Sequence, residues 1–258
     1  MKTVKAITVF LVLAIGAGFG IDASLRAATA PEPEARDWSF EGLFGTFDRA
    51  AAQRGFQVYQ NVCAGCHGLR HLAYRNLGAL GYTEDQVKAI AATVEVQDGP
   101  NDNGEMFFRK AKPSDRFKEP FPNEAAARAA NNGAYPPDLS VITKARPNGP
   151  DYLYALLTGY KDAPPEGVTI PEGMFYNEAF PGQQIAMVPP LAPDMVEYQD
   201  GTKATVPQMA KDVTTFLAWA SEPEMEDRKA LGRSVIIFLI VLTALLYALK
   251  RKIWSDLH

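Results

Sequence analysis

Cysteine and histidine are scarce in this chain, whose 258 residues include two cysteines and three histidines. Both cysteines and one histidine fall within a single short run, Cys63-Ala64-Gly65-Cys66-His67. A site built on that run leaves no thiol for a disulfide or for a second site of the same kind. The remaining histidines, His71 and His258, offer few imidazoles for binding a metal elsewhere.

Positive charge is also in short supply. The formal net charge is −4, and residues 31–229 hold 19 Lys and Arg against 28 Asp and Glu, a difference of −9. Such a balance excludes a broad basic surface, so nucleic acid is not an expected partner, whereas a basic protein is. An acidic surface that only improves solubility explains the same numbers.

The spacing Cys-x-x-Cys-His is the attachment signature of c-type haem. Two thiols three residues apart lie on one side of a helical turn, where each forms a thioether with one vinyl group of the porphyrin. We therefore predict one haem c, covalently bound through Cys63 and Cys66, with His67 as the proximal iron ligand. Attachment also implies export, because the thioethers form beyond the cytoplasmic membrane or its organellar equivalent.

A zinc site and a redox dithiol are the alternatives for these residues. Cys63, Cys66, His67 and His71 supply two thiols and two imidazoles, but such a zinc site needs a much longer gap between its halves. A thioredoxin-like dithiol requires a strand before the motif. Residues 48–61 instead show helical spacing of their alanine and aromatic residues, which disfavours this alternative.

The second axial position of the iron falls to methionine by elimination. His71 is too close to His67 to reach the opposite face, and His258 lies beyond a predicted membrane span. Met187 is favoured because Pro189 and Pro190 stiffen the loop behind it. The pattern alone leaves four others open: Met106, Met174, Met195 and Met209.

An iron with His and Met ligands has both axial positions filled, so the expected chemistry is one-electron transfer. Arg146 is a candidate partner for the haem propionates, because arginine binds carboxylates bidentately. An ordinary surface arginine is the alternative. The acidic residues on predicted loops (Glu84, Asp85, Glu95, Asp98, Asp102 and Glu105) are candidates for steering a basic cytochrome to the haem edge.

The chain divides into four predicted parts. Residues 1–30 have the form of a cleaved signal peptide, with an uncleaved anchor helix as the alternative, and residues 31–228 form the exported haem domain. Residues 230–249 are apolar enough to span a membrane, although a buried helix of a soluble protein is an alternative. Residues 250–258 would be a short cytoplasmic tail. These parts predict a single-pass protein of the cytoplasmic (inner) membrane with its haem domain on the periplasmic side.

The predicted fold is all-α, a class I cytochrome c domain with irregular insertions and a short β-hairpin, followed by the membrane helix. Asp200-Gly201 predicts the hairpin, pairing residues 195–199 with 202–206. Residues 95–122 show little periodicity and predict a long surface excursion. Five apolar residues predict an aromatic cluster at the start of the domain: Trp38, Phe40, Leu43, Phe44 and Phe47. The other predicted helices cover residues 48–61, 84–94, a short alanine-rich stretch after 123, 151–158 and 208–220.

A set of stretches spread over residues 38–256 resembles one family. Besides the haem motif and Met187 with its proline pair, they are residues 54–59, 82–85, 95–101, 104–107, 126–134, 136–140, 156–160, 181–183 and Lys250-Arg251 with Trp254. They resemble the cytochrome c1 family of alphaproteobacterial type, the haem subunits of the ubiquinol–cytochrome c oxidoreductase (cytochrome bc1) complex, or complex III.

The resemblance implies roles for particular residues. Met187 is the axial ligand, Arg146 lies at the propionates, and Asn131, Pro137 and Tyr152 belong to the haem pocket. Some bacterial members carry an extra disulfide near the ligand loop. This chain lacks that cysteine pair, so its Met187 loop is expected to be held by packing and proline alone.

The resemblance also implies a function in the respiratory chain. The chain would be a one-electron carrier subunit that takes electrons from the Rieske iron–sulfur subunit and passes them to cytochrome c, beside cytochrome b in a dimeric complex. It would not be an enzyme on its own, and it needs no catalytic residue. The acidic segment 95–105 falls where the family meets cytochrome c. The alternatives are a stand-alone membrane-anchored cytochrome c shuttle and a non-redox assembly subunit with a structural haem.

Overall fold

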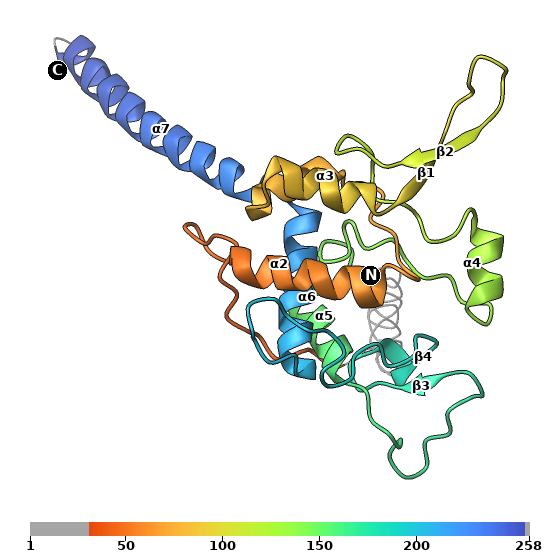
Figure 1. Cartoon of the computed structure of the whole chain (residues 1–258). Coiled ribbons are helices and arrows are strands. Elements are labelled where there is room, and N and C mark those ends of the chain that lie inside the picture. Colours follow the sequence, from red (N-terminus) through yellow and green to blue (C-terminus); the bar gives the residue numbers. More distant parts are fainter. Residues whose placement is uncertain (1–30, 256–258) are drawn as a thin grey trace, which may run out of the picture.

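The computed structural model describes residues 31–255, most of whose regular structure is helical (Figure 1). Two small antiparallel sheets accompany the helices, β1 with β2 and β3 with β4. The helices are α2 (Arg49–Val58), α3 (Glu84–Ala92), α4 (Glu124–Ala130), α5 (Gly149–Thr158), α6 (Val206–Ser221) and α7 (Met225–Ile253), and the strands are β1 (Glu95–Asp98), β2 (Phe107–Lys110), β3 (Phe175–Tyr176) and β4 (Gln184–Ile185). This confirms the mostly helical prediction, while the class I cytochrome c arrangement stays a prediction.

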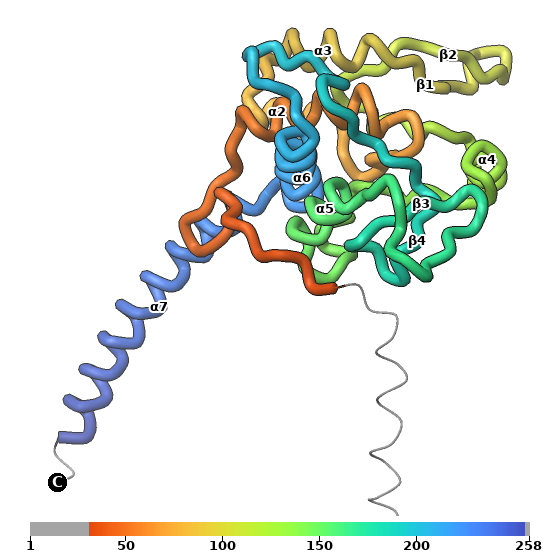
Figure 2. Tube along the Cα trace, turned by 90° about the horizontal axis from the view of Figure 1, so that it is seen from below, coloured from red at the N-terminus to blue at the C-terminus, as the bar shows by residue number. Residues whose placement is uncertain are grey.

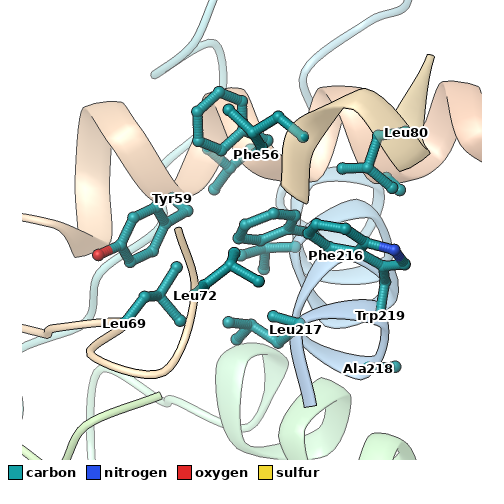
Figure 3. Packing of buried hydrophobic residues seen from close by; sticks show 14 of the residues in the cluster. Phe56, Tyr59, Leu69, Leu72, Leu80, Phe216, Leu217, Ala218 and Trp219 are labelled. Carbon is teal, nitrogen blue, oxygen red and sulfur yellow. The ribbon is translucent and has the colours of Figure 1, made fainter. Parts of the chain in front are cut away.

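The core forms where α2 packs against α6 (Figure 3). Gly55 allows the close approach, because a Cβ atom there would lie 2.0 Å from the Asp212 carbonyl oxygen. Aromatic rings fill the space beside this crossing. The centroid of the Phe216 ring lies 5.5 Å from that of Phe56 and 5.8 Å from that of Tyr59. Because Tyr59 directly follows α2, this core holds the approach to the cysteine motif rigidly.

A buried ion pair joins the same two helices. Arg54 of α2 lies 3.0 Å from the Asp212 carboxylate of α6, whose side chain is fully buried. Gln208 also donates to both oxygens of that carboxylate, at 3.1 and 3.0 Å. Burying a charge is costly unless it is paired and hydrogen-bonded, and Asp212 is both.

Side-chain caps set the starts of several helices. The Asp48 carboxylate accepts from the Ala51 amide at the start of α2, and Thr83 and Gln86 form a capping box at the start of α3. Asn123 caps α4 through the Ala126 amide. Each side chain satisfies a backbone amide that the first helical turn leaves without a partner.

The prediction of a hairpin at Asp200-Gly201 is wrong, because residues 195–199 and 202–206 form no strands. The dipeptide makes an isolated turn, and Arg54 donates to the Asp200 carboxylate at 2.8 Å. That ion pair ties the turn to α2, so no partner strand is needed to hold it.

The hairpin of this fold is β1–β2, within the stretch for which the sequence predicts only an irregular excursion. Glu95 pairs with Lys110 and Asp98 with Phe107 in its register. Side chains on both strands are exposed or half-buried. Each strand has only four residues, Glu-Val-Gln-Asp and Phe-Phe-Arg-Lys, too few for a clear alternation of apolar and polar residues.

The predicted aromatic cluster is confirmed in part. Trp38, Phe40 and Phe47 are buried in the core, but Leu43 and Phe44 are 55% and 75% exposed. The two exposed residues occupy the tip of a loop, which is why helical or strand periodicity does not describe them.

α7 projects from the helical body in both views (Figures 1 and 2). It contains 29 residues, its most apolar 18-residue window has a mean hydropathy of 2.2, and none of that window is buried. The predicted span of residues 230–249 lies inside it. A helix of this length and composition can cross a bilayer, which fits a membrane-anchored protein. The predicted signal peptide, residues 1–30, and the last three residues of the tail lie outside the described residues.

Candidate haem-binding site

The cysteine motif lies at the end of α2. The helix continues as a π-helical turn, Tyr59–Cys63, and the chain then coils once more. The amides of Cys66 and His67 donate to the Cys63 carbonyl at 3.1 and 2.9 Å, which holds the three motif residues on one compact turn. Both thiols are free, with Cys63 half-buried and Cys66 exposed.

The His67 ring is already oriented by a backbone group. Its Nδ1 lies 2.7 Å from the Pro137 carbonyl oxygen. A carbonyl only accepts, so the Nδ1 atom carries the proton and donates, which leaves the Nε2 lone pair available to a metal. Burial lowers the pKa of His67, outweighing the opposing effects of Pro137 and Asp138, so the ring is neutral at neutral pH.

Residues 68–71, directly after His67, are hydrogen-bonded to residues 138–140. The Gly68 carbonyl accepts from the Leu139 amide at 2.9 Å, and the Arg70 amide donates to the Asp138 carboxylate at 2.9 Å. The His71 amide donates to the Ser140 hydroxyl at 3.1 Å. The sequence does not predict this pairing of residues 68–71 with 138–140. His71, to which the sequence assigns no role, contributes its backbone, and its side chain is exposed.

Met187 lies in a loop that hydrogen bonds hold in place. The Tyr160 hydroxyl donates to the Met187 carbonyl at 3.0 Å, and the β3–β4 ladder ends two residues before Met187. The expectation that packing and proline alone hold this loop is therefore wrong. Sequence reasoning misses Tyr160 because 27 residues separate it from the carbonyl it binds.

Arg146 and Tyr152 are linked electrostatically to Tyr160, whose hydroxyl binds the Met187 carbonyl. Burial raises the pKa of Tyr152, and the nearby Arg146 guanidinium opposes the shift. Burial likewise raises the pKa of Tyr160, and Tyr152 adds to the shift. Arg146 is exposed, and its guanidinium binds the adjacent Ala145 carbonyl at 3.0 Å. It therefore remains accessible to a carboxylate.

Of the predicted pocket residues, Pro137 has a defined contact through its carbonyl, as described above. Asn131 bonds within its own segment, since its side-chain amide donates to the Ala127 carbonyl at 2.7 Å. Its position at the end of α4 thus has a structural reason of its own. A place for Asn131 in the haem pocket stays a prediction.

The residues present fit a covalently bound haem. Two free thiols share a turn with a neutral imidazole whose Nε2 is available, and a pocket opens beside Cys66, lined by Gly68, Arg70, Tyr135 and Asp138 among others. Cys63 and Tyr152 both pack against the main hydrophobic cluster.

The competing chemistries fit less well. Burial, with help from Cys66, raises the pKa of Cys63 to about 12, whereas a redox dithiol depends on a stabilised thiolate. A helix, not a strand, leads into the motif. Among residues 31–255, no group of three or more His, Cys, Asp and Glu side chains is arranged to hold a metal ion.

Comparisons with known proteins give a consistent answer. The sequence model of the cytochrome C1 family matches residues 38–257. The chain is 50% identical to cytochrome c1 of Rhodospirillum rubrum over 236 residues, covering 86% of this chain and 87% of that protein. The chain belongs to the cytochrome c1 family.

Two further relatives extend this family assignment. A mitochondrial cytochrome c1 heme protein of Arabidopsis thaliana is 56% identical over 221 residues, which cover 85% of this chain and 71% of that protein. The cytochrome b/c1 protein of Bradyrhizobium diazoefficiens is 49% identical over 279 residues. That match covers 98% of this chain but 41% of the longer protein. The bacterial relatives support the alphaproteobacterial type of this cytochrome c1 family member.

The acidic residues of the β1–β2 region are not equivalent. Asp98 pairs with Arg109, which also lies 2.5 Å from Asp115. The charge of Asp98 is therefore largely compensated within the hairpin. Glu95, Asp102 and Glu105 are exposed, so their carboxylates are accessible to a basic partner.

Proposed function

We propose that this chain is the one-electron carrier subunit of a ubiquinol–cytochrome c oxidoreductase complex. The observation that supports it best is the motif turn, in which Pro137 fixes the His67 ring with its Nε2 available beside two free thiols. When bound, haem c would supply a one-electron centre that accepts from the Rieske iron–sulfur subunit and donates to cytochrome c. Cytochrome b would be the neighbouring subunit, in a dimeric complex.

The chain's own residues have distinct tasks in this proposal. Cys63 and Cys66 would hold the haem covalently, and the His67 imidazole and the Met187 thioether would be the protein ligands of its iron. Tyr160 keeps the Met187 loop in position through its 3.0 Å bond. Arg146 compensates the propionates, and Asn131, Pro137 and Tyr152 complete the pocket.

The membrane arrangement belongs to the same proposal. Residues 1–30 would be a cleaved signal peptide and residues 31–228 the exported haem domain. Residues 230–249 would cross the inner membrane once, with the domain on the periplasmic side and residues 250–258 on the other. Basic residues flank both ends of the apolar run, Lys250 to Lys252 at one end and Arg228, Lys229 and Arg233 at the other, so the predicted signal peptide decides the orientation.

Purification in mild detergent tests this function. We expect the haem-loaded full chain to co-purify with a cytochrome b and an iron–sulfur protein. A haem protein that runs alone in detergent, but still exchanges electrons with cytochrome c in solution, would favour the stand-alone shuttle. Co-purification with subunits but a haem that never changes redox state would favour the structural role.

A further inference from the structure

We propose that the loop of residues 39–46 is a second membrane contact, whose Leu43 and Phe44 side chains enter the lipid headgroup and acyl-chain boundary beside α7. This inference rests on the proposed membrane span of α7 and extends it to the head domain. Leu43 and Phe44 are neighbouring apolar residues whose side chains are 55% and 75% exposed. They are flanked by Phe40 and Phe47, which are buried and anchor the loop in the core.

The loop has a fixed shape. Its ends are joined by a bond from the Thr46 amide to the Ser39 carbonyl at 2.9 Å. Gly42 has a φ of +70°, and a Cβ atom at Gly45 would lie 1.8 Å from the Glu41 carbonyl oxygen. The tight turn therefore needs both glycines. Its backbone holds Leu43 and Phe44 at the tip, where their side chains are exposed.

Hydrogen bonds from the first turns of α7 fix the position of this loop along the helix axis. Lys229 donates to the Phe40 carbonyl at 2.6 Å and to the Gly45 carbonyl at 3.1 Å. Arg233 donates to the Leu43 carbonyl at 3.2 Å, and its guanidinium lies 5.5 Å from the centroid of the Phe44 ring. The tube view shows the loop beside the start of α7 (Figure 2).

This position along α7 is where the membrane surface is expected. Arg233 is the last charged residue before an uncharged run that continues to Leu249, so the bilayer core begins directly beyond it. Arg233, the residue that marks this boundary, binds the Leu43 carbonyl and lies over the Phe44 ring. Lys and Arg side chains beside aromatic and aliphatic ones are typical of a membrane interface, where the cations meet lipid phosphates and the apolar groups enter the acyl layer.

A lipid surface explains these features better than a protein partner does. The first turns of α7, which hold the loop, also expose the apolar side chains of Leu231 and Val235. Two cations stand next to it, as anionic lipids require. The consequence is that the head domain is held at a fixed tilt against the membrane instead of swinging on α7.

Site-directed spin labelling tests the contact in the haem-loaded full chain, reconstituted into phosphatidylcholine–phosphatidylglycerol vesicles. Labels are placed at Phe44→Cys and, as a second variant, Leu43→Cys. Collisions with oxygen, which concentrates in lipid, are compared with collisions with a water-soluble nickel chelate. Phe108→Cys is the matched control, because Phe108 is also an exposed phenylalanine, at 67%, but lies on the β1–β2 hairpin. Leu239→Cys reports α7, and the unaltered chain gives the labelling background of Cys63 and Cys66.

We expect labels at positions 43 and 44 to favour oxygen over nickel at least severalfold relative to position 108, and less strongly than position 239. A nickel-accessible label at 44 together with a lipid-exposed label at 239 would overturn the loop contact but keep the span. A label at 44 shielded from both reagents would show a protein covering the loop and would also overturn it. Nickel access at both 44 and 239 would contradict the proposed span itself.

Discussion

At the scale of single residues, one hydrogen bond orients each of the two proposed iron ligands, His67 and Met187. The Pro137 carbonyl fixes the tautomer of His67, and the Tyr160 hydroxyl fixes the backbone of Met187. Such outer contacts orient metal ligands, and losing one typically costs about 10- to 100-fold in metal affinity or activity. They also identify which residues to change.

The first prediction concerns Met187. We expect Met187→Leu to keep the haem covalently attached but to lower its reduction potential by on the order of 0.1 V or more, within the roughly 0.8 V range that axial ligands span. The loss of a thioether ligand is the physical reason. A redox titration followed by absorbance measures it.

Met195→Leu is the matched control, because Met195 lies on the same stretch of chain and is 52% exposed. Its potential should match that of the unaltered protein. If Met187→Leu leaves the potential unchanged, the axial ligand is another of the methionines, and the assignment of Met187 fails.

At the scale of elements, the α2–α6 crossing carries the site. Replacing Arg54 with Ala leaves the Asp212 carboxylate buried without its cation, which should cost about 3–5 kcal/mol of the free energy of unfolding. Denaturant unfolding of the variant measures this. The double variant Arg54→Met with Asp212→Leu should be more stable than the single variant.

Arg49→Ala provides the comparison on the same helix. The Arg49–Glu226 pair is more exposed, with side chains 42% and 26% accessible, so its loss should cost no more than about 1 kcal/mol. Equal losses for Arg49→Ala and Arg54→Ala would show that burial of Asp212 does not govern this interface.

The β1–β2 hairpin should loosen in acid. The hydrogen bonds from Arg109 lower the pKa of Asp115 to about 2, from an ordinary value of 3.8. A lowered pKa means that the ionised pair stabilises the fold fully above pH 4, and that the stabilisation disappears as the pH falls from about 4 to 2. Amide exchange in β2, corrected for the intrinsic rate at each pH, should therefore accelerate over this range.

The Asp115→Asn variant tests whether the Asp115–Arg109 pair causes the acid loosening. In this variant the β2 amides should already exchange about two- to fivefold faster at pH 6 and should lose most of the acid dependence. Unchanged acid dependence in Asp115→Asn would assign the effect to other carboxylates.

Short sequence patterns predict many of the helices in this fold. They do not predict the contacts between residues far apart in the chain. The caps at Asp48, Thr83 and Asn123 depend on neighbours within three residues, so sequence patterns identify them. The Tyr160–Met187 bond joins distant residues and leaves no periodic trace. The turn at Asp200 shows the converse error, since a strong local turn signal does not require that strands flank it.

At the scale of the whole molecule, the exposed acidic face predicts a salt-sensitive encounter with a basic cytochrome c. Neutralising Glu95, Asp102 and Glu105 together should slow cytochrome c reduction by about tenfold at low ionic strength, with little effect at high ionic strength. Stopped-flow reduction over a salt series measures this.

Neutralising Glu32, Glu34 and Asp37 removes as many charges from an exposed segment elsewhere in the domain. It should leave the salt dependence of cytochrome c reduction nearly unchanged. If both triple variants slow the reaction equally, net charge governs the encounter, and the β1–β2 face is not the docking surface.

The central claim is that this chain carries electrons from quinol within a membrane complex. The most direct measurement is the redox state of its haem after quinol is added to membranes that contain the full chain, followed by absorbance. We predict rapid reduction, which disappears when the iron–sulfur subunit is removed, and reoxidation when oxidised cytochrome c is added. A haem that stays oxidised in the presence of quinol and intact partner subunits would contradict the account.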